Sequence, residues 1–339
     1  MKRIYLTVDT ECHDFKRLNQ YIYGKTQKGE YGLKCILEIG KNHNIPINIF
    51  LDIPECNAYG NDYIQDIINL VKSYNQKIYF HFHPNYKSND ERSYLWEYSE
   101  KEQEKLLNEG FKEYYAFCGK GDKVAFRAGR YGVDKKTYKI LSQQDIPVID
   151  FSYCANRPKM CHLSDKDVST QNRPIRFEGV VLQPNTSYVG FDYFNIKKNI
   201  LLGVTDTTFN EFSRIIRTTK LNSITYCMHS WSLMDKWFFL KNYVGGNRSA
   251  IKRMEKCIEE AKRNGYVFSD IDSFEYIDDS YDELQDLSSS FSGKIYGIGN
   301  NFLRFQRMAK INKKYFAIYA LFYFAIILII TFCIVKFLG

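Results

Sequence analysis

The stretch Ile78-Tyr79-Phe80-His81-Phe82-His83-Pro84 carries two histidines, two positions apart, in a short apolar and aromatic run. Side chains two positions apart in a β-strand point to the same face, so both imidazoles are expected on one side. Pro84 has no N–H to donate to a neighbouring strand and is expected to end the pairing. Two histidines that converge at a strand end predict half of a metal site, and a structural histidine pair is the alternative.

Acidic and basic side chains follow two other strand-like runs. The run over residues 4–8 leads to Asp9 and Glu11, which are again two positions apart. The run over residues 124–128 leads into a glycine-bounded turn, and Arg127 or Arg130 at this junction suits bidentate orientation of a carboxylate. A helix cap and a surface turn are the structural alternatives for these two places.

A lone histidine, His229, ends the strand-like run over residues 223–231. Taken alone, such a histidine is more often structural than catalytic. Sites of α/β proteins are built at the carboxyl ends of parallel strands, so all these side chains are expected to share one edge of the sheet. Carboxylates and histidines around one point would hold a divalent metal such as zinc, which lowers the pKa of bound water to about 7. This set of residues predicts hydrolysis of an amide or an ester.

Strand-like and helix-like patterns alternate along the chain, and this order predicts an α/β fold with a parallel sheet and crossover connections. Residues 155–200 are rich in loops, with short strands at 175–177 and 180–183. The helices are expected at 33–40, 63–74, 97–115, 134–142, 210–219 and 250–264. The strands are expected at 4–8, 45–52, 78–83, 124–128, 146–152, 223–231 and 266–268.

The 339 residues are 45% hydrophobic and 16% aromatic, which is enough for a large core. The net charge is +8, but residues 301–339 hold six basic residues and no acid, which leaves +2 for residues 1–300. The sequence therefore predicts no nucleic-acid partner. The nine cysteines show no Cys-x-x-Cys spacing and are expected to be reduced thiols.

Residues 315–335 form an uncharged run of about the length that spans a bilayer, and Lys313 and Lys314 precede it. We expect a transmembrane helix here; a buried core helix or an interfacial hairpin is the alternative. The basic flank predicts that the preceding residues face the cytoplasm, and the N-terminal sequence does not read as a signal peptide. The expectation is therefore a single-pass C-terminal (tail) anchor, joined by a linker and basic juxtamembrane segment over residues 278–314.

The order of four motifs resembles the NodB-homology polysaccharide deacetylases over about residues 2–275. The motifs are Thr7-Val8-Asp9-Thr10-Glu11, Tyr79-Phe80-His81-Phe82-His83-Pro84, Phe126-Arg127-Ala128-Gly129-Arg130-Tyr131-Gly132 and Thr225-Tyr226-Cys227-Met228-His229. The resemblance implies a distorted (β/α) barrel of about seven parallel strands, here residues 1–277. It also implies removal of acetyl groups from N-acetylated sugars with a divalent metal.

Carried over by motif, the resemblance implies that Asp9 is the general base and Arg127 the group that orients it. It also implies that His81 is a metal ligand and His229 the general acid. The sequence departs from the family pattern at two places. Threonine replaces the second aspartate of the first motif, so Glu11 is the expected substitute ligand. Asparagine stands four positions after His81, so His83 is the expected second histidine. An alternative is that Asp9 itself binds the metal.

The expected function is therefore that of a carbon–nitrogen hydrolase with a divalent metal, most simply Zn²⁺. The expected substrate is an N-acetylated sugar of a glycan or a lipid-linked glycan precursor, in surface-polysaccharide metabolism. Two alternatives stay open: a non-catalytic carbohydrate-binding or scaffold protein of a membrane assembly, and a metal-free hydrolase of another amide. The presence of Asp9, Arg127 and His229 together favours an enzyme, because a binding protein needs neither an acid nor a base.

Overall fold

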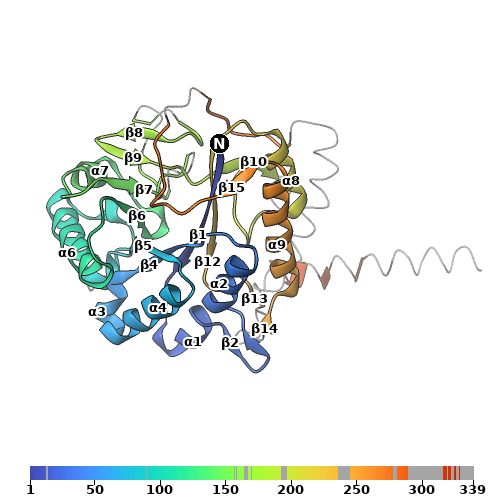
Figure 1. Cartoon of the computed structure of the whole chain (residues 1–339), viewed down its shortest axis with the longest axis horizontal. Coiled ribbons are helices and arrows are strands. Elements are labelled where there is room, and N and C mark those ends of the chain that lie inside the picture. Colours follow the sequence, from blue (N-terminus) through green and yellow to red (C-terminus); the bar gives the residue numbers. More distant parts are fainter. Residues whose placement is uncertain are drawn as a thin grey trace, which may run out of the picture.

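The structure of the protein is a computed structural model that describes residues 1–12, 14–88, 90–155, 157, 159–163, 167–168, 170–191, 197–235, 245–277 and 281–288, and eight positions between 316 and 328. A curved sheet of nine strands lies at its centre, with helices around its outside (Figure 1). In spatial order the strands are β12 (Ser223–His229), β1 (Lys2–Thr10), β4 (Asn48–Asp52), β5 (Lys77–Phe82), β6 (Val124–Ala128), β7 (Val148–Asp150), β9 (Val180–Leu182) and β8 (Ile175–Phe177), and β15 (Tyr266–Phe268) lies beside β1.

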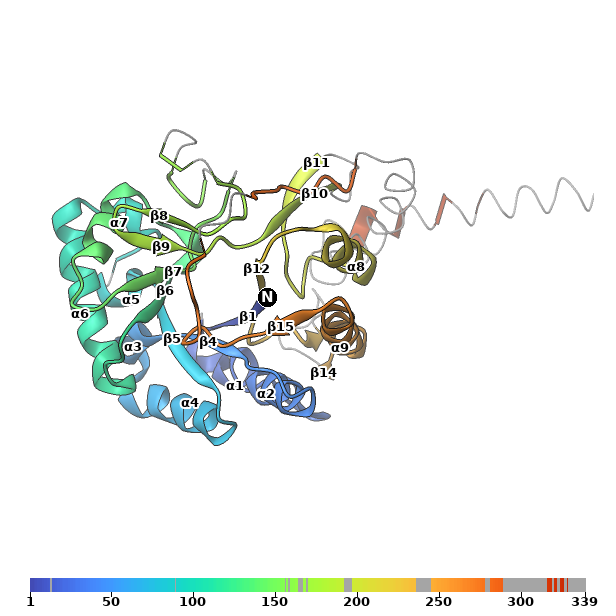
Figure 2. The ribbon, with the colours of Figure 1, turned by 45° about the horizontal axis from the view of Figure 1, so that its top comes forward.

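Every neighbouring pair of strands in this sheet is parallel except β8 with β9. The predicted α/β fold around a parallel sheet is therefore confirmed. Strand β1 is the most heavily paired, because β12 runs along one edge while β15 and β4 follow one another along the other. Figure 2 shows β1 and β12 side by side and the other strands curving away from them.

Among the described residues the ladder of strands does not close into a ring, because its path ends at β12 and β8. Side chains bridge this seam between β12 and the residues that follow β9. The hydroxyl of Ser223 donates to Oε1 of Gln183 at 2.6 Å, and the hydroxyl of Thr225 donates to the carbonyl of Pro184 at 2.9 Å. Backbone groups contribute as well, because Cys227 donates its N–H to the carbonyl of Leu202 and Val204 donates its N–H to the carbonyl of Cys227. The result is a distorted barrel whose seam is closed by side-chain hydrogen bonds and by the residues that follow β11.

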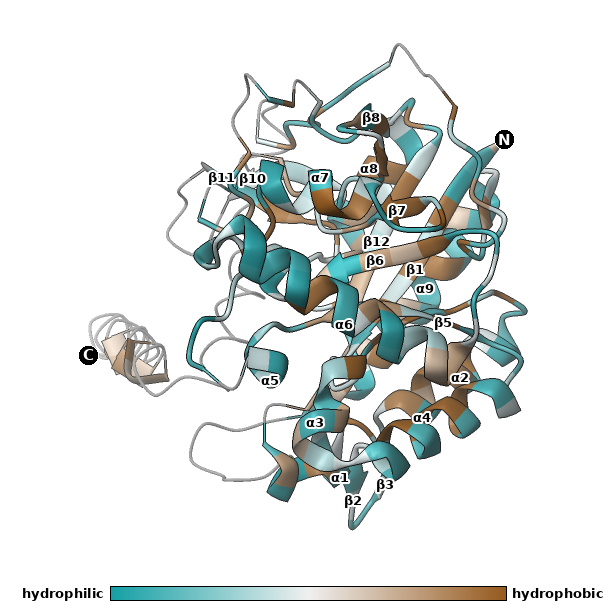
Figure 3. Cartoon of the chain, turned by 90° about the vertical axis from the view of Figure 1, so that its left-hand side faces the viewer, coloured by the Kyte–Doolittle hydropathy of each residue, from teal (hydrophilic) through white to brown (hydrophobic). Residues whose placement is uncertain are grey.

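Amphipathic helices cover the outer face of the sheet, as the 3.6-residue periodicity predicts. Figure 3 shows polar and apolar segments alternating along α2 and α4. Three helices begin with a capping box, at Ser99, Asp134 and Thr208. The helices are α1 (Leu18–Tyr21), α2 (Leu33–Asn42), α3 (Cys56–Tyr59), α4 (Asn61–Ser73), α5 (Asn85–Ser88), α6 (Glu100–Cys118), α7 (Lys135–Ser142), α8 (Phe209–Thr218) and α9 (Arg248–Arg263).

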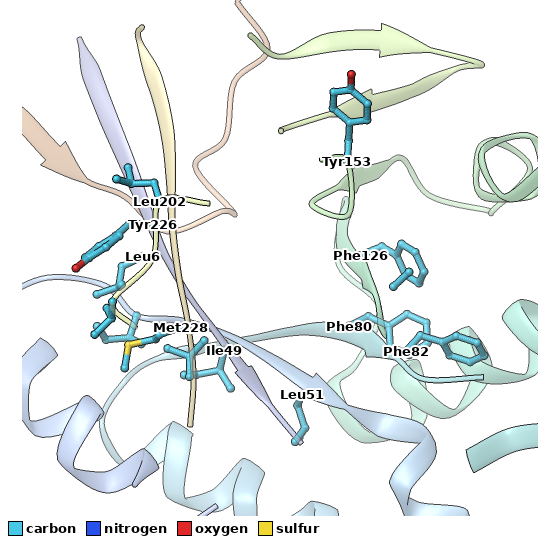
Figure 4. Close-up of a cluster of buried hydrophobic side chains, with 14 of the residues drawn as sticks. Leu6, Ile49, Leu51, Phe80, Phe82, Phe126, Tyr153, Leu202, Tyr226 and Met228 are labelled. Atoms are coloured by element: carbon cyan, nitrogen blue, oxygen red, sulfur yellow. The ribbon is translucent and has the colours of Figure 1, made fainter. Parts of the chain in front are cut away.

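The alternation of side chains along the strands divides the core into an outer and an inner layer. The outer layer packs against the helices and includes Leu6, Ile49, Phe80 and Phe126 (Figure 4). The inner layer is smaller, and its strand residues are Tyr5, Phe50, Tyr79, Ala125 and Ile149. Because the period is two, the next inward positions toward the carboxyl ends carry the polar residues singled out in the sequence.

Two regions differ from the sequence-based expectation. A hairpin of β10 (Ser187–Phe191) and β11 (Lys197–Leu201) lies within the loop-rich part of the chain. Residues 281–288, which the expectation places in a linker, lie against the body: Asp282 accepts backbone N–H groups of residues 171–173, and Leu287 donates its N–H to Val189. Two further hairpins are formed by β2 (Lys25–Thr26) with β3 (Gly29–Glu30), and by β13 (Met234–Asp235) with β14 (Gly245–Gly246).

No helix formed by the described residues is both long enough and apolar enough to cross a membrane. Most of the expected transmembrane segment, residues 315–335, lies outside the described residues, as does all of residues 289–314.

Candidate metal and catalytic site

The register of the parallel strands brings the predicted site residues together at one end of the barrel. Asp9 on β1 lies opposite His229 on β12, and His81 on β5 lies between Asp52 on β4 and Arg127 on β6. Along each strand these residues lie on the same face as the inner core layer, so their side chains point into the barrel. The shared edge expected from the sequence is thus formed.

Glu11, His81 and His83 form a compact cluster whose potential ligand atoms all lie within 4.8 Å of one another. Nε2 of His83 is 2.5 Å from Oε2 of Glu11, and Nε2 of His81 is 3.4 Å from the same oxygen. All three side chains are buried. Two imidazole nitrogens therefore face one carboxylate oxygen, as the His-x-His spacing on one strand face predicts.

Residues of the neighbouring strands hold the two histidines in place. Nδ1 of His81 lies 2.9 Å from the carbonyl oxygen of Arg127, so it donates its proton there and leaves the Nε2 lone pair toward Glu11. The backbone N–H of His83 donates to Oδ1 of Asp52 at 3.0 Å, just beyond the end of β5. The first contact orients the ring of His81, and the second holds the backbone of His83 in place.

Glu11 and His81 shift one another's pKa in the direction that favours the charged forms of both groups. Burial alone would raise the pKa of Glu11, but His83 and His81 outweigh this effect and hold the pKa well below its ordinary value. Burial opposes the protonated form of His81, yet the hydrogen bond with Glu11 and the charges of Asp9 and Glu11 raise its pKa. Glu11 is therefore an anion, and its charge in turn raises the pKa of His81.

A divalent transition metal fits this donor set. One carboxylate and two imidazoles, all buried, match the ligand types that zinc and similar metals take in proteins. The contact between His81 and the Arg127 carbonyl is of the kind that holds metal-binding histidines in position. The cluster leaves Asp9 outside it, so the geometry favours Glu11 over Asp9 as the carboxylate ligand.

Asp9 is instead paired with Arg127. Nη1 of Arg127 donates to Oδ1 of Asp9, and both side chains are buried. The other donors of the guanidinium are held as well: Nη2 donates to Thr7 and Asn185, and Nε donates to the carbonyl of Phe151. Burial opposes the charge of Arg127, but Asp9 raises its pKa above the ordinary value. Arg127 therefore holds one carboxylate in a fixed orientation.

The choice between Arg127 and Arg130 is decided by the turn after β6. Arg130 has a φ of 55°, which is left-handed backbone, and its side chain is exposed. Its guanidinium carbon lies 5.8 Å from the centre of the Tyr94 ring. Arg127 is the arginine that points into the barrel.

His229 lies at the border between the cluster and solvent. Its Nε2 is 3.6 Å from Oε1 of Glu11, and its side chain is 42% exposed. The ring stacks on Trp231 with 4.6 Å between ring centres, and Tyr21 meets Trp231 edge to face. An imidazole that is both near the cluster and open to solvent can exchange a proton with a bound molecule.

Two buried carboxyl groups near the site were not predicted. Asp52 ends β4, and Glu55 accepts hydrogen bonds from the backbone of Cys12 and the hydroxyl of Tyr63. Burial raises the pKa of both carboxyl groups well above their ordinary values, and nearby carboxylates add to the effect. The position of Asp52 at a strand end was a usable signal. Asn185, which lies in an irregular segment, offered none.

No protein-family model matches the chain, and no curated protein matches it in sequence. The chain is similar to several solved structures. One is a putative polysaccharide deacetylase from Mycobacterium smegmatis, with a TM-score of 0.47 and 15% identity over 79% of this chain and 86% of that chain. A family 4 carbohydrate esterase from Bacillus subtilis gives 0.40 and 14% over 80% and 79%.

A maltose-forming amylase from Pyrococcus sp. ST04 gives a TM-score of 0.46 and 12% identity, over 79% of this chain and 47% of that chain. All of these TM-scores are below 0.5 and all identities are below 25%, so the likeness assigns neither an activity nor a substrate to this chain.

Proposed function

We propose that the protein is a metal-dependent hydrolase that removes an acetyl group from an N-acetylated sugar of a glycan or a lipid-linked glycan precursor. The observation that carries this proposal is that two carboxylates, two residues apart, have different partners. Glu11 lies with the two imidazoles of His81 and His83, whereas Asp9 is held by Arg127. One carboxylate is thus available to a metal and the other to a proton.

Each residue has a defined task in this proposal. Glu11, His81 and His83 hold the metal, which when bound polarises the amide carbonyl and lowers the pKa of water. Asp9 accepts a proton from the attacking water while Arg127 holds its carboxylate in place. His229 gives a proton to the leaving nitrogen as the carbon–nitrogen bond breaks. The products are acetate and the free amine of the sugar.

The test is release of acetate from N-acetylglucosamine oligosaccharides and from lipid-linked N-acetylated glycans. The wild-type protein loaded with Zn²⁺ is expected to release acetate, and Asp9→Asn is expected to abolish the release while retaining the metal. Asp122→Asn, which changes an exposed aspartate in the same way, is the matched control. Metal-loaded wild-type protein that releases no acetate from any of these substrates would refute the proposal.

We further propose that residues 315–335 span a membrane, with the catalytic body on the cytoplasmic side. The uncharged run and its basic flank support this proposal. The described positions within the run are helical, and Leu321, Phe324 and Leu328 are each more than half exposed, so the body does not bury them. Replacing Leu321, Phe324 and Leu328 by Asp should release the protein from membranes into the soluble fraction. Continued sedimentation of this variant with membranes would contradict the proposal.

A further inference from the structure

A cavity of about 530 Å³ lies beside His229, between the carboxyl end of β12, the residues that follow β11 and the beginning of α9. His229 and Trp231 line one part of it, and Arg157, Arg253 and Asn247 line other parts. Its volume is in the range of sites that bind small molecules. Glu11, His81 and His83 do not line it, but His229, which lies 3.6 Å from Glu11, does, so the cavity adjoins the catalytic site at His229.

The two arginines of this cavity have unused hydrogen-bond donors. Nη2 of Arg157 donates to the carbonyl of Asn199 at 3.1 Å, and Nη2 of Arg253 donates to the carbonyl of Val204 at 2.8 Å. Both guanidinium groups are therefore tied to the main chain of residues 199–204. Their Nε atoms are buried without a hydrogen-bond partner, and neither group forms an ion pair within the part of the chain that the structure describes. Nη1 of Arg157 also lies 3.7 Å from Sδ of Met160, which is a weak acceptor. A guanidinium offers five N–H donors, so both groups keep donors for a further partner.

The beginning of α9 also lines this cavity. Asn247 is the N-cap of this helix, and both Asn247 and Ala250 line the cavity. The first turn of α9 contains no acidic residue. The positive end of the helix dipole is thus not neutralised by its own side chains, and it adds to the field of the two arginines.

The lining is not uniformly basic, because Asp206 and Asp235 also contribute to it. Carboxylates in a sugar-binding cavity can accept hydrogen bonds from hydroxyl groups, and the ring of Trp231 offers an apolar surface. The cavity therefore combines carboxylate oxygens with guanidinium groups.

We propose that Arg157 and Arg253 bind an anionic oxygen group, a phosphate or a carboxylate, carried by the sugar substrate. This inference rests on the proposed deacetylase function and narrows its substrates to charged sugars. Guanidinium groups match the oxygen pairs of both anions, so the site recognises an oxyanion. His229 joins the cavity to the catalytic cluster, so a sugar held by its anion would present another part of the ring to the metal residues.

The test is calorimetric titration of the full-length protein with N-acetylglucosamine, N-acetylglucosamine 1-phosphate and glucuronate. A chelator removes metal first, so that anions cannot bind at the metal residues. At least one charged sugar is expected to bind the wild type about tenfold or more tightly than the neutral sugar. Arg157→Gln and Arg253→Gln should each abolish this preference, and Arg253→Lys should retain part of it. The exposed Lys252→Gln, on the same helix, is the matched control and should keep it.

The comparison between the two charged sugars distinguishes phosphate from carboxylate. Equal binding of neutral and charged sugars by the wild type would overturn the inference, as would a preference that survives in both glutamine variants. Because the titration needs neither metal nor turnover, its result is independent of acetate release. Anion preference without acetate release would refute the proposed function alone, and acetate release without anion preference would refute only the inference.

Discussion

Nε2 of His83 lies 2.5 Å from Oε2 of Glu11, although the two residues are far apart in the sequence. The pairing of strands in the sheet brings them together. The contact exists because Glu11 follows β1 and His83 follows β5, and both strands point their carboxyl ends to the same edge. It places the less expected histidine of the sequence closer to the carboxylate than His81, whose Nε2 is 3.4 Å away.

Removing His83 should therefore remove the metal. We expect His83→Ala to weaken Zn²⁺ binding by more than the roughly 10–100-fold that loss of an outer partner causes. The measurement is the metal content after equilibrium dialysis against buffers of fixed free Zn²⁺. His162→Ala, which changes an exposed histidine, should bind as the wild type does. Stoichiometric tight binding by His83→Ala would show that His83 is not a ligand.

Arg127 should be essential for stability as well as for activity. Arg127→Met leaves the Asp9 carboxylate buried without its partner, which costs about 3–5 kcal/mol in free energy of unfolding. Urea denaturation measures this loss. The double variant Asp9→Asn, Arg127→Met should be more stable than the sum of the single changes predicts, because neither charge is then left alone. Arg130→Met should change the free energy of unfolding by no more than about 0.5 kcal/mol. Strict additivity would contradict a direct ion pair.

Substitution of His229 should lower the rate of acetate release without changing the metal content of the protein. Its side chain is 42% exposed, so His229→Gln should leave the stability within about 0.5 kcal/mol of the wild type. The rate of acetate release should fall by roughly 10²–10⁴-fold, which is the usual contribution of a general acid. Metal content and steady-state kinetics on the same sample provide the measurement. An unchanged kcat would exclude His229 as the acid.

Asp150 should make the stability depend on pH. Burial raises the pKa of this carboxyl group to about 6, while Tyr138 and the backbone of Tyr153 donate hydrogen bonds to it. The folded state thus binds the proton more tightly than the unfolded state, whose pKa is about 3.9. The contribution of Asp150 is greatest below pH 4 and is lost as the pH rises to about 6, by up to about 3 kcal/mol.

Asp150→Asn should remove this dependence, because the amide keeps an acceptor oxygen and does not titrate. Urea denaturation of both proteins at several pH values between 4 and 7 measures the difference between them, so the titration of other groups cancels. The stability of Asp150→Asn relative to the wild type should rise with pH across this window. A constant difference would mean that Asp150 titrates normally.

Much of the site was predictable because it depends on short-range periodicity. Alternation in a strand places His81 and His83 on one face, and the order of strands and helices places their ends together. The hairpin of β10 and β11 was missed because Gly190, Lys197, Lys198 and Asn199 are residue types that are uncommon in strands, so neither strand shows a clear pattern. Arg157 and Arg253 were missed for a different reason: each is an ordinary surface residue until residues 199–204 bring them to one cavity.

The unequal pairing of the strands has a consequence for the order in which the protein opens. Strand β1, which leads to both carboxylates of the site, has three neighbours in the sheet, whereas β8 lies at the end of the strand order and pairs only with β9 among the described strands. Amide hydrogens of β1 should exchange with solvent only through global unfolding, and those of β8 through local opening. Strand β8 can therefore open locally while Asp9 and Glu11 stay fixed, so the reactive groups keep their positions at temperatures at which the end of the sheet already fluctuates.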